Sequence, residues 1–110
     1  MSPERKYLGE FEQMVAAAIL RLGEKAYGVS IIETIEERTG RPVSSGALSV
    51  TLDRMEKKGL LLSRLADADD GRGGRPRRYV ELTADGREAA SEARAAMLRL
   101  WQGLGGAYER

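Results

Sequence analysis

The chain has 110 residues, of which 42% are hydrophobic and 32% charged, and its 18 Lys and Arg against 17 Asp and Glu leave a net charge of +1. This length fits one globular domain, and any electrostatic function must be local because the charges nearly cancel. The chain contains neither Cys nor His. Their absence excludes disulfides, Cys/His zinc sites, thiolate nucleophiles and Ser-His triads, so we expect a protein that is not an enzyme and that holds no metal and no cofactor.

The N-terminal region lacks the pattern of an exported or membrane-bound protein. Residues 1–7 are polar, and the longest early apolar run covers only residues 14–20. That run is too short and too far along the chain for a signal peptide or a membrane span. We therefore expect a flexible N-terminus over residues 1–7 and a cytoplasmic protein with no membrane partner.

Apolar residues at spacings of three and four predict three helices in the first half of the chain. These helices cover residues 8–22, 28–39 and 44–58, and Gly23 and Gly59 follow the first and the third. Ser44 or Ser45 can cap the third helix. The inner faces expected for the three helices are formed by Val15, Ala18 and Ile19, by Ile31, Ile32 and Ile35, and by Leu48, Leu52 and Met55.

After Gly59 the pattern changes to two short extended runs, residues 60–66 and 79–82, separated by a loop rich in Gly, Asp and Arg. This change predicts a β-hairpin over about residues 60–82, which we call the wing. The segment from residue 71 to residue 80 contains no acid and four arginines, which are Arg72, Arg75, Arg77 and Arg78. The wing is therefore expected to be a local basic surface.

Thr83 can cap a last helix, predicted over residues 84–106. Its apolar stripe cannot all pack on a body that the first helix already closes, and a chain of this size gains stability by burying it on a second copy. We therefore expect a homodimer. The residues predicted for the interface are Leu8, Phe11, Ala93, Met97, Leu100, Trp101 and Leu104.

The order of these elements predicts a mainly α fold with a small β-hairpin (α+β). We expect a winged helix-turn-helix domain over residues 8–83, followed by a C-terminal dimerisation helix over residues 84–106. In such a unit the helix over residues 44–58 can lie in the major groove of DNA, while arginines of the wing contact phosphates. The residues predicted to contact double-stranded DNA are Ser44, Ser45, Ser49, Arg54, Lys57, Arg72, Arg75, Arg77 and Arg78. Serines at a helix start also have a local explanation as caps, so we expect one of them to be a cap.

From about residue 8 to residue 96 the sequence resembles the PadR-like transcriptional regulators. The resemblance is carried by LGEFE at 8–12, AYG at 26–28, S-x-GA at 44–47, TLDRMEKKGL at 51–60, GGRPRRY at 73–79 and LTADG at 82–86. It implies a homodimeric DNA-binding repressor of the short subclass, which dimerises through a single C-terminal helix together with the N-terminal helix. One position departs from the family pattern, because Ser49 stands where the family usually has tyrosine.

Two alternatives stay open at this point. A winged helix can also serve as a protein-protein interaction module without DNA binding, and the serine at position 49 keeps this possibility. The arginines of the wing favour DNA. The sequence does not decide whether a small-molecule effector exists, and if one does, we expect its site between the body and the last helix near Trp101.

Overall fold

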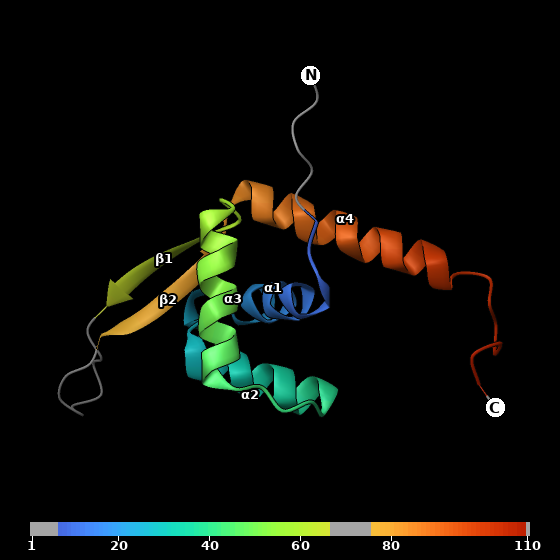
Figure 1. Cartoon of the computed structure of the whole chain (residues 1–110), viewed down its shortest axis with the longest axis horizontal. Coiled ribbons are helices and arrows are strands. Elements are labelled where there is room, and N and C mark those ends of the chain that lie inside the picture. Colours follow the sequence, from blue (N-terminus) through green and yellow to red (C-terminus); the bar gives the residue numbers. More distant parts are fainter. Residues whose placement is uncertain (1–6, 67–75, 110) are drawn as a thin grey trace, which may run out of the picture.

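The computed structural model describes residues 7–66 and 76–109. The elements follow one another as α1 (Glu10–Leu22), a 3-10 helix η1 (Gly23–Lys25), α2 (Gly28–Thr39), α3 (Ser45–Lys57), β1 (Leu61–Ala66), β2 (Arg77–Leu82) and α4 (Ala84–Trp101). In Figure 1, α3 lies across α1, the two strands extend beside α3, and α4 runs away from the other elements. The predicted α+β class with one hairpin is confirmed.

Helices α3 and α4 begin at side-chain caps that satisfy backbone N–H groups of their first turns. Ser44 Oγ accepts a hydrogen bond of 3.1 Å from the Ala47 N–H, so Ser44 is the cap of α3 and Ser45 is the first helical residue. Thr83 Oγ1 accepts a hydrogen bond of 3.0 Å from the Gly86 N–H. Helix α1 begins at Glu10, later than predicted, because Gly9 before it is extended and its N–H is bonded to Glu12 Oε1.

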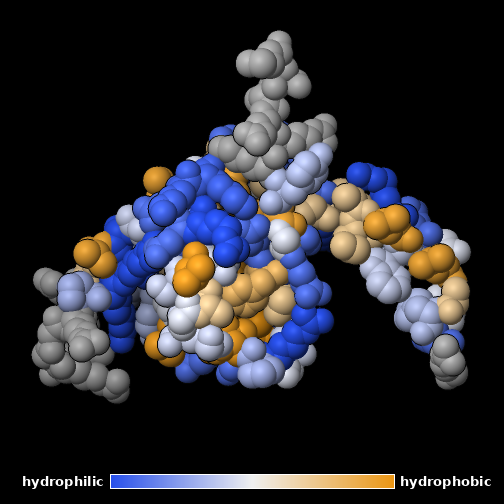
Figure 2. All heavy atoms as spheres, in the orientation of Figure 1, coloured by the Kyte–Doolittle hydropathy of each residue, from blue (hydrophilic) through white to orange (hydrophobic). Residues whose placement is uncertain are grey.

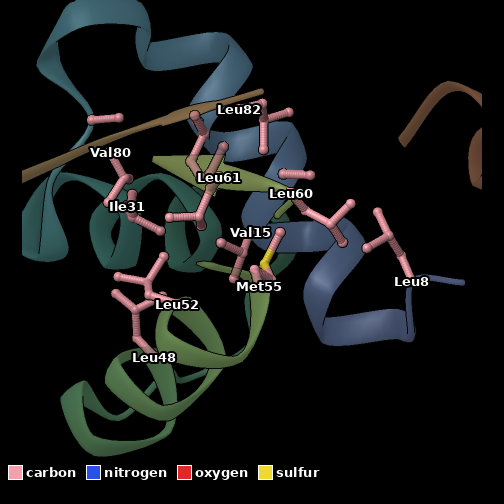
Figure 3. Packing of buried hydrophobic residues seen from close by; sticks show 14 of the residues in the cluster. Leu8, Val15, Ile31, Leu48, Leu52, Met55, Leu60, Leu61, Val80 and Leu82 are labelled. Carbon is pink, nitrogen blue, oxygen red and sulfur yellow. The ribbon is translucent and has the colours of Figure 1, made fainter. Parts of the chain in front are cut away.

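A single apolar core lies where the helices and the wing meet. Figure 3 shows Val15 of α1, Ile31 of α2 and Met55 of α3 pointing toward one another. All three side chains are fully buried, and Leu60 and Leu61 close the core from the start of the wing. Burial of such side chains is the main favourable contribution to the stability of this body.

The wing is an antiparallel pair in which Leu61 lies opposite Leu82 and Ala66 lies opposite Arg77. The Val80 N–H ties it to the body by donating to the carbonyl of Ala26, between η1 and α2, at 3.0 Å, and the Thr83 N–H closes the hairpin by donating to the Leu60 carbonyl at 3.0 Å. Strand β2 starts at Arg77, before the predicted residue 79. The wing is therefore fixed to the body by main-chain hydrogen bonding.

Helix α4 joins the body only over its first half. Ala89 is buried and Ala93 is half-buried, whereas Met97 and every residue after it to the end of the helix are exposed. The helix ends at Trp101, so the predicted extension to residue 106 is wrong and Leu104 lies beyond the helix. The chain turns there because Gly103 and Gly105 adopt φ values of +84° and +56°, a conformation that favours glycine and does not continue a right-handed helix. Within residues 7–66 and 76–109, no helix has both the length and the hydropathy that crossing a bilayer requires.

Candidate nucleic-acid interface

The outer face of α3 is opposite its packing face. Leu48, Leu52 and Met55 are buried as predicted, and Thr51 is buried with them. All of the remaining α3 residues are exposed. The exposed residues include the predicted contacts Ser45, Ser49, Arg54 and Lys57, so all four side chains are accessible.

The first two turns of this surface carry only small side chains, and they include an apolar residue that the sequence analysis did not select. Val50 is 57% exposed and lies one turn after Gly46, on the side away from the core. A Cβ atom added at Gly46 would meet no atom within 4 Å, so packing does not require glycine at this position. Small side chains allow a helix to approach a base-pair edge closely. The signal for Val50 was present in the sequence, because this valine falls outside the Leu48, Leu52 and Met55 stripe.

The second half of α3 is charged, and the wing lies against one side of it. Arg78 of β2 forms ion pairs with two acids of α3, at 2.9 Å from Nη1 to Asp53 Oδ1 and at 2.7 Å from Nη2 to Glu56 Oε1. Ser63 of β1 donates a hydrogen bond of 2.9 Å to the same Glu56 oxygen. The hydrogen bonds from Ser63 and Arg78 hold the pKa of Glu56 below its ordinary value of 4.5. Arg78 is therefore directed toward α3.

The opposite face of the wing carries a row of stacked rings and guanidinium groups. The Arg77 guanidinium lies 4.6 Å from the centre of the Tyr27 ring, and the Arg64 guanidinium lies 4.7 Å from the centre of the Tyr79 ring. The two tyrosine rings lie between them, with centroids 5.5 Å apart. Cation–π contacts of this kind hold a cationic group at a fixed place on the surface without neutralising its charge. The rings therefore hold the guanidinium groups of Arg77 and Arg64 on this face of the wing.

The lysine that follows α3 and the remaining predicted contacts have different positions. Lys58 Nζ lies 3.1 Å from Oε2 of the buried Glu12, so it forms an ion pair with α1. Ser44 is exposed but serves as the cap of α3. Arg72 and Arg75 lie outside the described residues.

The residues predicted for a dimer interface fall into two groups. Leu8 is only 8% exposed and belongs to the core of its own chain, so, contrary to the expectation, it offers almost no surface to a partner. Phe11 is half-buried against the same core. Met97, Leu100 and Trp101 are exposed on the outer half of α4, and Leu104 is exposed beyond it. Figure 2 shows apolar side chains gathered on this outer half, apart from the body.

A groove of about 450 Å³ lies between α1 and α4. Its lining includes Ala17 and Leu20 of α1 and Ala90, Met97 and Leu98 of α4. Trp101 does not line this groove, and its ring packs edge-on against Tyr108, with centroids 5.2 Å apart. The apolar wall of the groove continues onto the exposed outer half of α4.

Among the described residues, no group of three or more acids could hold a metal ion. The arrangement that these residues do form is a helix with small polar and apolar side chains on its outer face, flanked by a wing with arginines on both faces. Such a surface can bind a polyanion that has a groove of helical width.

Comparison with known proteins agrees with this geometry. The model of the transcriptional regulator PadR-like family matches residues 18–92. No curated protein matches the chain. A PadR family transcriptional regulator from Eggerthella lenta DSM 2243 is 26% identical, with a TM-score of 0.69 over 91% of this chain and 87% of that chain.

Two further solved structures support the fold. A PadR family transcription regulator from Clostridium difficile R20291 is 24% identical, with a TM-score of 0.70 over 91% of this chain and 98% of that chain. A PadR-like transcriptional regulator from Bacillus cereus strain ATCC 14579 is 21% identical, with a TM-score of 0.73 over 91% of this chain and 92% of that chain. Proteins of this family are transcriptional regulators and not enzymes. The chain, matched by the family model over most of its length, belongs to the PadR-like family of transcriptional regulators.

Proposed function

We propose that this protein is a cytoplasmic repressor that binds an inverted-repeat DNA operator as a homodimer. The observation that carries the proposal is the outer face of α3, where Ser45, Ser49 and Val50 are exposed together and no long side chain stands among them. The start of a recognition helix is the part that contacts base edges in helix-turn-helix proteins. The proposal therefore places these residues against the bases.

Each side chain has a role that follows from its chemistry. The hydroxyl groups of Ser45 and Ser49 can donate to or accept from a base edge, and the methyl groups of Val50 fit the C5-methyl group of thymine. Arg54 and Lys57, which are exposed further along α3, contact a base edge or a phosphate at the border of the groove. Arg77, Arg72 and Arg75 of the wing contact phosphates.

The dimer in this proposal is formed by the outer half of α4. The exposed side chains of Met97, Leu100 and Trp101 pack on a second copy, against its α4 and the groove beside α1. A two-fold dimer presents two α3 helices to the DNA, so the centres of the half-sites are expected about 34 to 36 Å apart or at a multiple of that distance.

The experiment is a selection of genomic DNA with the purified protein, followed by salt titrations. The selected fragments should contain an inverted repeat. Replacing Arg72, Arg75 and Arg77 with Ala should weaken binding to operator and random duplex alike, and it should flatten the slope of log affinity against log salt by about two to three units if all three contact phosphate.

Two results would contradict the proposal. An unchanged salt slope would mean that these wing arginines do not contact phosphates. Failure to enrich any duplex would favour the alternative of a winged-helix module that contacts another protein.

A further inference from the structure

Arg78 has a position that differs from that of a phosphate-binding arginine. On β2 it is two residues before the buried Val80 and four before the buried Leu82, so it lies on the same face of the strand as these core residues. Its side chain is only 28% exposed, and both of its terminal nitrogens are bonded to carboxylates of α3. Both terminal nitrogens of the Arg78 guanidinium are thus already paired with α3.

The charges around Arg78 also oppose a phosphate contact. Asp53 and Glu56 bring two carboxylates to one guanidinium, so this cluster has an excess of negative charge. Like charges repel, and a DNA phosphate approaching Arg78 would have to displace both carboxylates or lie beside them. Arg77, the neighbouring residue, lies on the other face of the strand, where its guanidinium lies over the Tyr27 ring.

The position of Arg78 along the wing lets its ion pairs connect α3 to a part of the wing far from the base. Arg78 lies opposite Leu65, four residues beyond the pair of Leu61 and Leu82 at the base. Four residues of a strand span about 13 Å. At this distance from the base, Arg78 bonds to Glu56 of α3, and Ser63, two residues beyond the base, donates to the same carboxylate.

We propose that Arg78 is a positioning residue, which fixes the angle between the wing and α3 so that α3 meets the groove while the wing meets the flanking phosphates. This inference rests on the proposed function, because the angle matters only if both elements bind one duplex. A free wing would still attract phosphates through its other arginines. It would no longer hold α3 in register with the bases.

The test compares the wild-type protein with Arg78→Ala, with Asp53→Asn/Glu56→Gln and with the triple variant, each bound to the selected operator and to a random duplex of equal length. Arg78→Ala should lower the ratio of operator to random affinity by about fivefold or more, which is the loss that one missing base-edge contact produces. The salt slope on random DNA should stay that of the wild type. The acid variant should lower the ratio by a similar factor, and the triple variant should lower it no further, because the three groups act as one unit.

Arg77→Ala is the matched control, since it removes the same charge from the other face of the same strand. It should flatten the salt slope by about 0.9 and leave the ratio unchanged. The proposal is overturned if Arg78→Ala behaves like this control, because Arg78 then contacts phosphate. It is also overturned if the losses of the acid variant and of Arg78→Ala add in the triple variant.

A titration of the free protein separates this inference from the proposed function. Arg78→Ala should raise the pKa of Glu56 toward its ordinary value, observed by NMR of the side-chain carboxyl carbon, because one of the two hydrogen bonds that stabilise the carboxylate is lost. An unchanged pKa means that the contact does not exist in solution and refutes the positioning role even if the protein binds DNA. A wild-type protein that binds no duplex refutes the proposed function, and the positioning role in DNA binding falls with it.

Discussion

Apolar side chains are buried in the winged-helix body and exposed on the outer half of α4. In the body, Val15, Ile31 and Met55 are fully buried within one chain. On α4, Leu98 and Trp101 are half exposed and Leu100 is 74% exposed. A contiguous exposed apolar face of this kind is typical of a surface that another molecule covers. The body can therefore fold from its own contacts, whereas the outer half of α4 requires a partner to bury its apolar face.

Removing the outer half of α4 is the direct way to separate the two regions. A chain ended after Arg94 keeps Ala89 and Ala90, which pack on the body, and loses every large exposed apolar residue of α4. We expect a folded monomer whose operator affinity falls by about 10²- to 10⁴-fold, because the two half-sites are no longer bound together. Light scattering and a DNA titration measure the two effects.

The truncated chain should keep the helical circular dichroism of the remaining elements, which serves as the control for folding. A truncated protein that is still dimeric would show that the body itself forms the interface. A full-length protein that is monomeric at micromolar concentration and still binds an inverted repeat tightly would contradict both the interface and the two-fold symmetry.

The junction between the body and α4 depends on Gly86. A Cβ atom at this position would overlap the carbonyl oxygen of Leu60, which already accepts the Thr83 N–H and cannot move away without breaking that bond. Gly86→Ala should therefore lower the free energy of unfolding by at least about 3 kcal/mol, at the upper end of the cost of overpacking. Urea denaturation measures this change.

Gly46→Ala is the matched control, because Gly46 is also helical but faces open space. It should raise the free energy of unfolding by up to about 1 kcal/mol, since alanine favours a helix over glycine. The same variant should bind the operator less tightly, because the proposal brings the α3 backbone close to the bases at this residue. Equal destabilisation by both substitutions would contradict the distinction between a packed glycine and a glycine at the binding surface.

The parts of the fold that follow a period could be predicted residue by residue. Leu48, Leu52 and Met55 recur with the helical repeat and are buried, as are Ile31 and Ile35, while Ile32 of the same predicted face is half-buried. The end of α4 could not be predicted in this way, because Leu104 continues the stripe at the right spacing while the flanking glycines turn the chain. The start of β2 was missed because a pair of arginines carries no hydrophobic signal.

The elements that carry the predicted DNA contacts could be located from the sequence, whereas the contacts of individual side chains within the fold could not. Ser45, Ser49, Arg54 and Lys57 are exposed on α3 as expected. Arg78 was grouped with Arg77 because both are cationic, although neighbours on a strand point to opposite faces. Its acidic partners lie 22 and 25 residues away in the sequence, so only the fold reveals the contact.

The proposed contact between the exposed Val50 and a thymine methyl group can be tested by changing the DNA. Replacing each thymine of the operator in turn with deoxyuridine removes one methyl group. We expect one position at which the wild-type protein loses about fourfold in affinity, equivalent to about 0.8 kcal/mol for one buried methyl group. The loss at that position should disappear in Val50→Ala, and an equal loss in both proteins would mean that another residue meets the methyl group.

The smallest expected effect concerns the contact between the wing and α3, which should depend on pH through Glu56. The pKa of Glu56 is lowered in the folded protein, first by the hydrogen bond from Ser63 and then by that from Arg78. A carboxyl group with a lowered pKa binds its proton less readily when folded, so its contribution to stability is present above the ordinary pKa of 4.5 and is lost as the pH falls through the lowered value. We therefore expect the wild type to be more stable than Glu56→Gln at neutral pH, and this difference should shrink as the pH falls below 4.5 and through the lowered pKa of Glu56. Urea denaturation of both proteins across this range measures the difference, and Ser63→Ala, which removes the first of the two hydrogen bonds, should shift its loss to higher pH. A difference that stays constant across the range would show that Glu56 does not couple the wing to α3 through its charge.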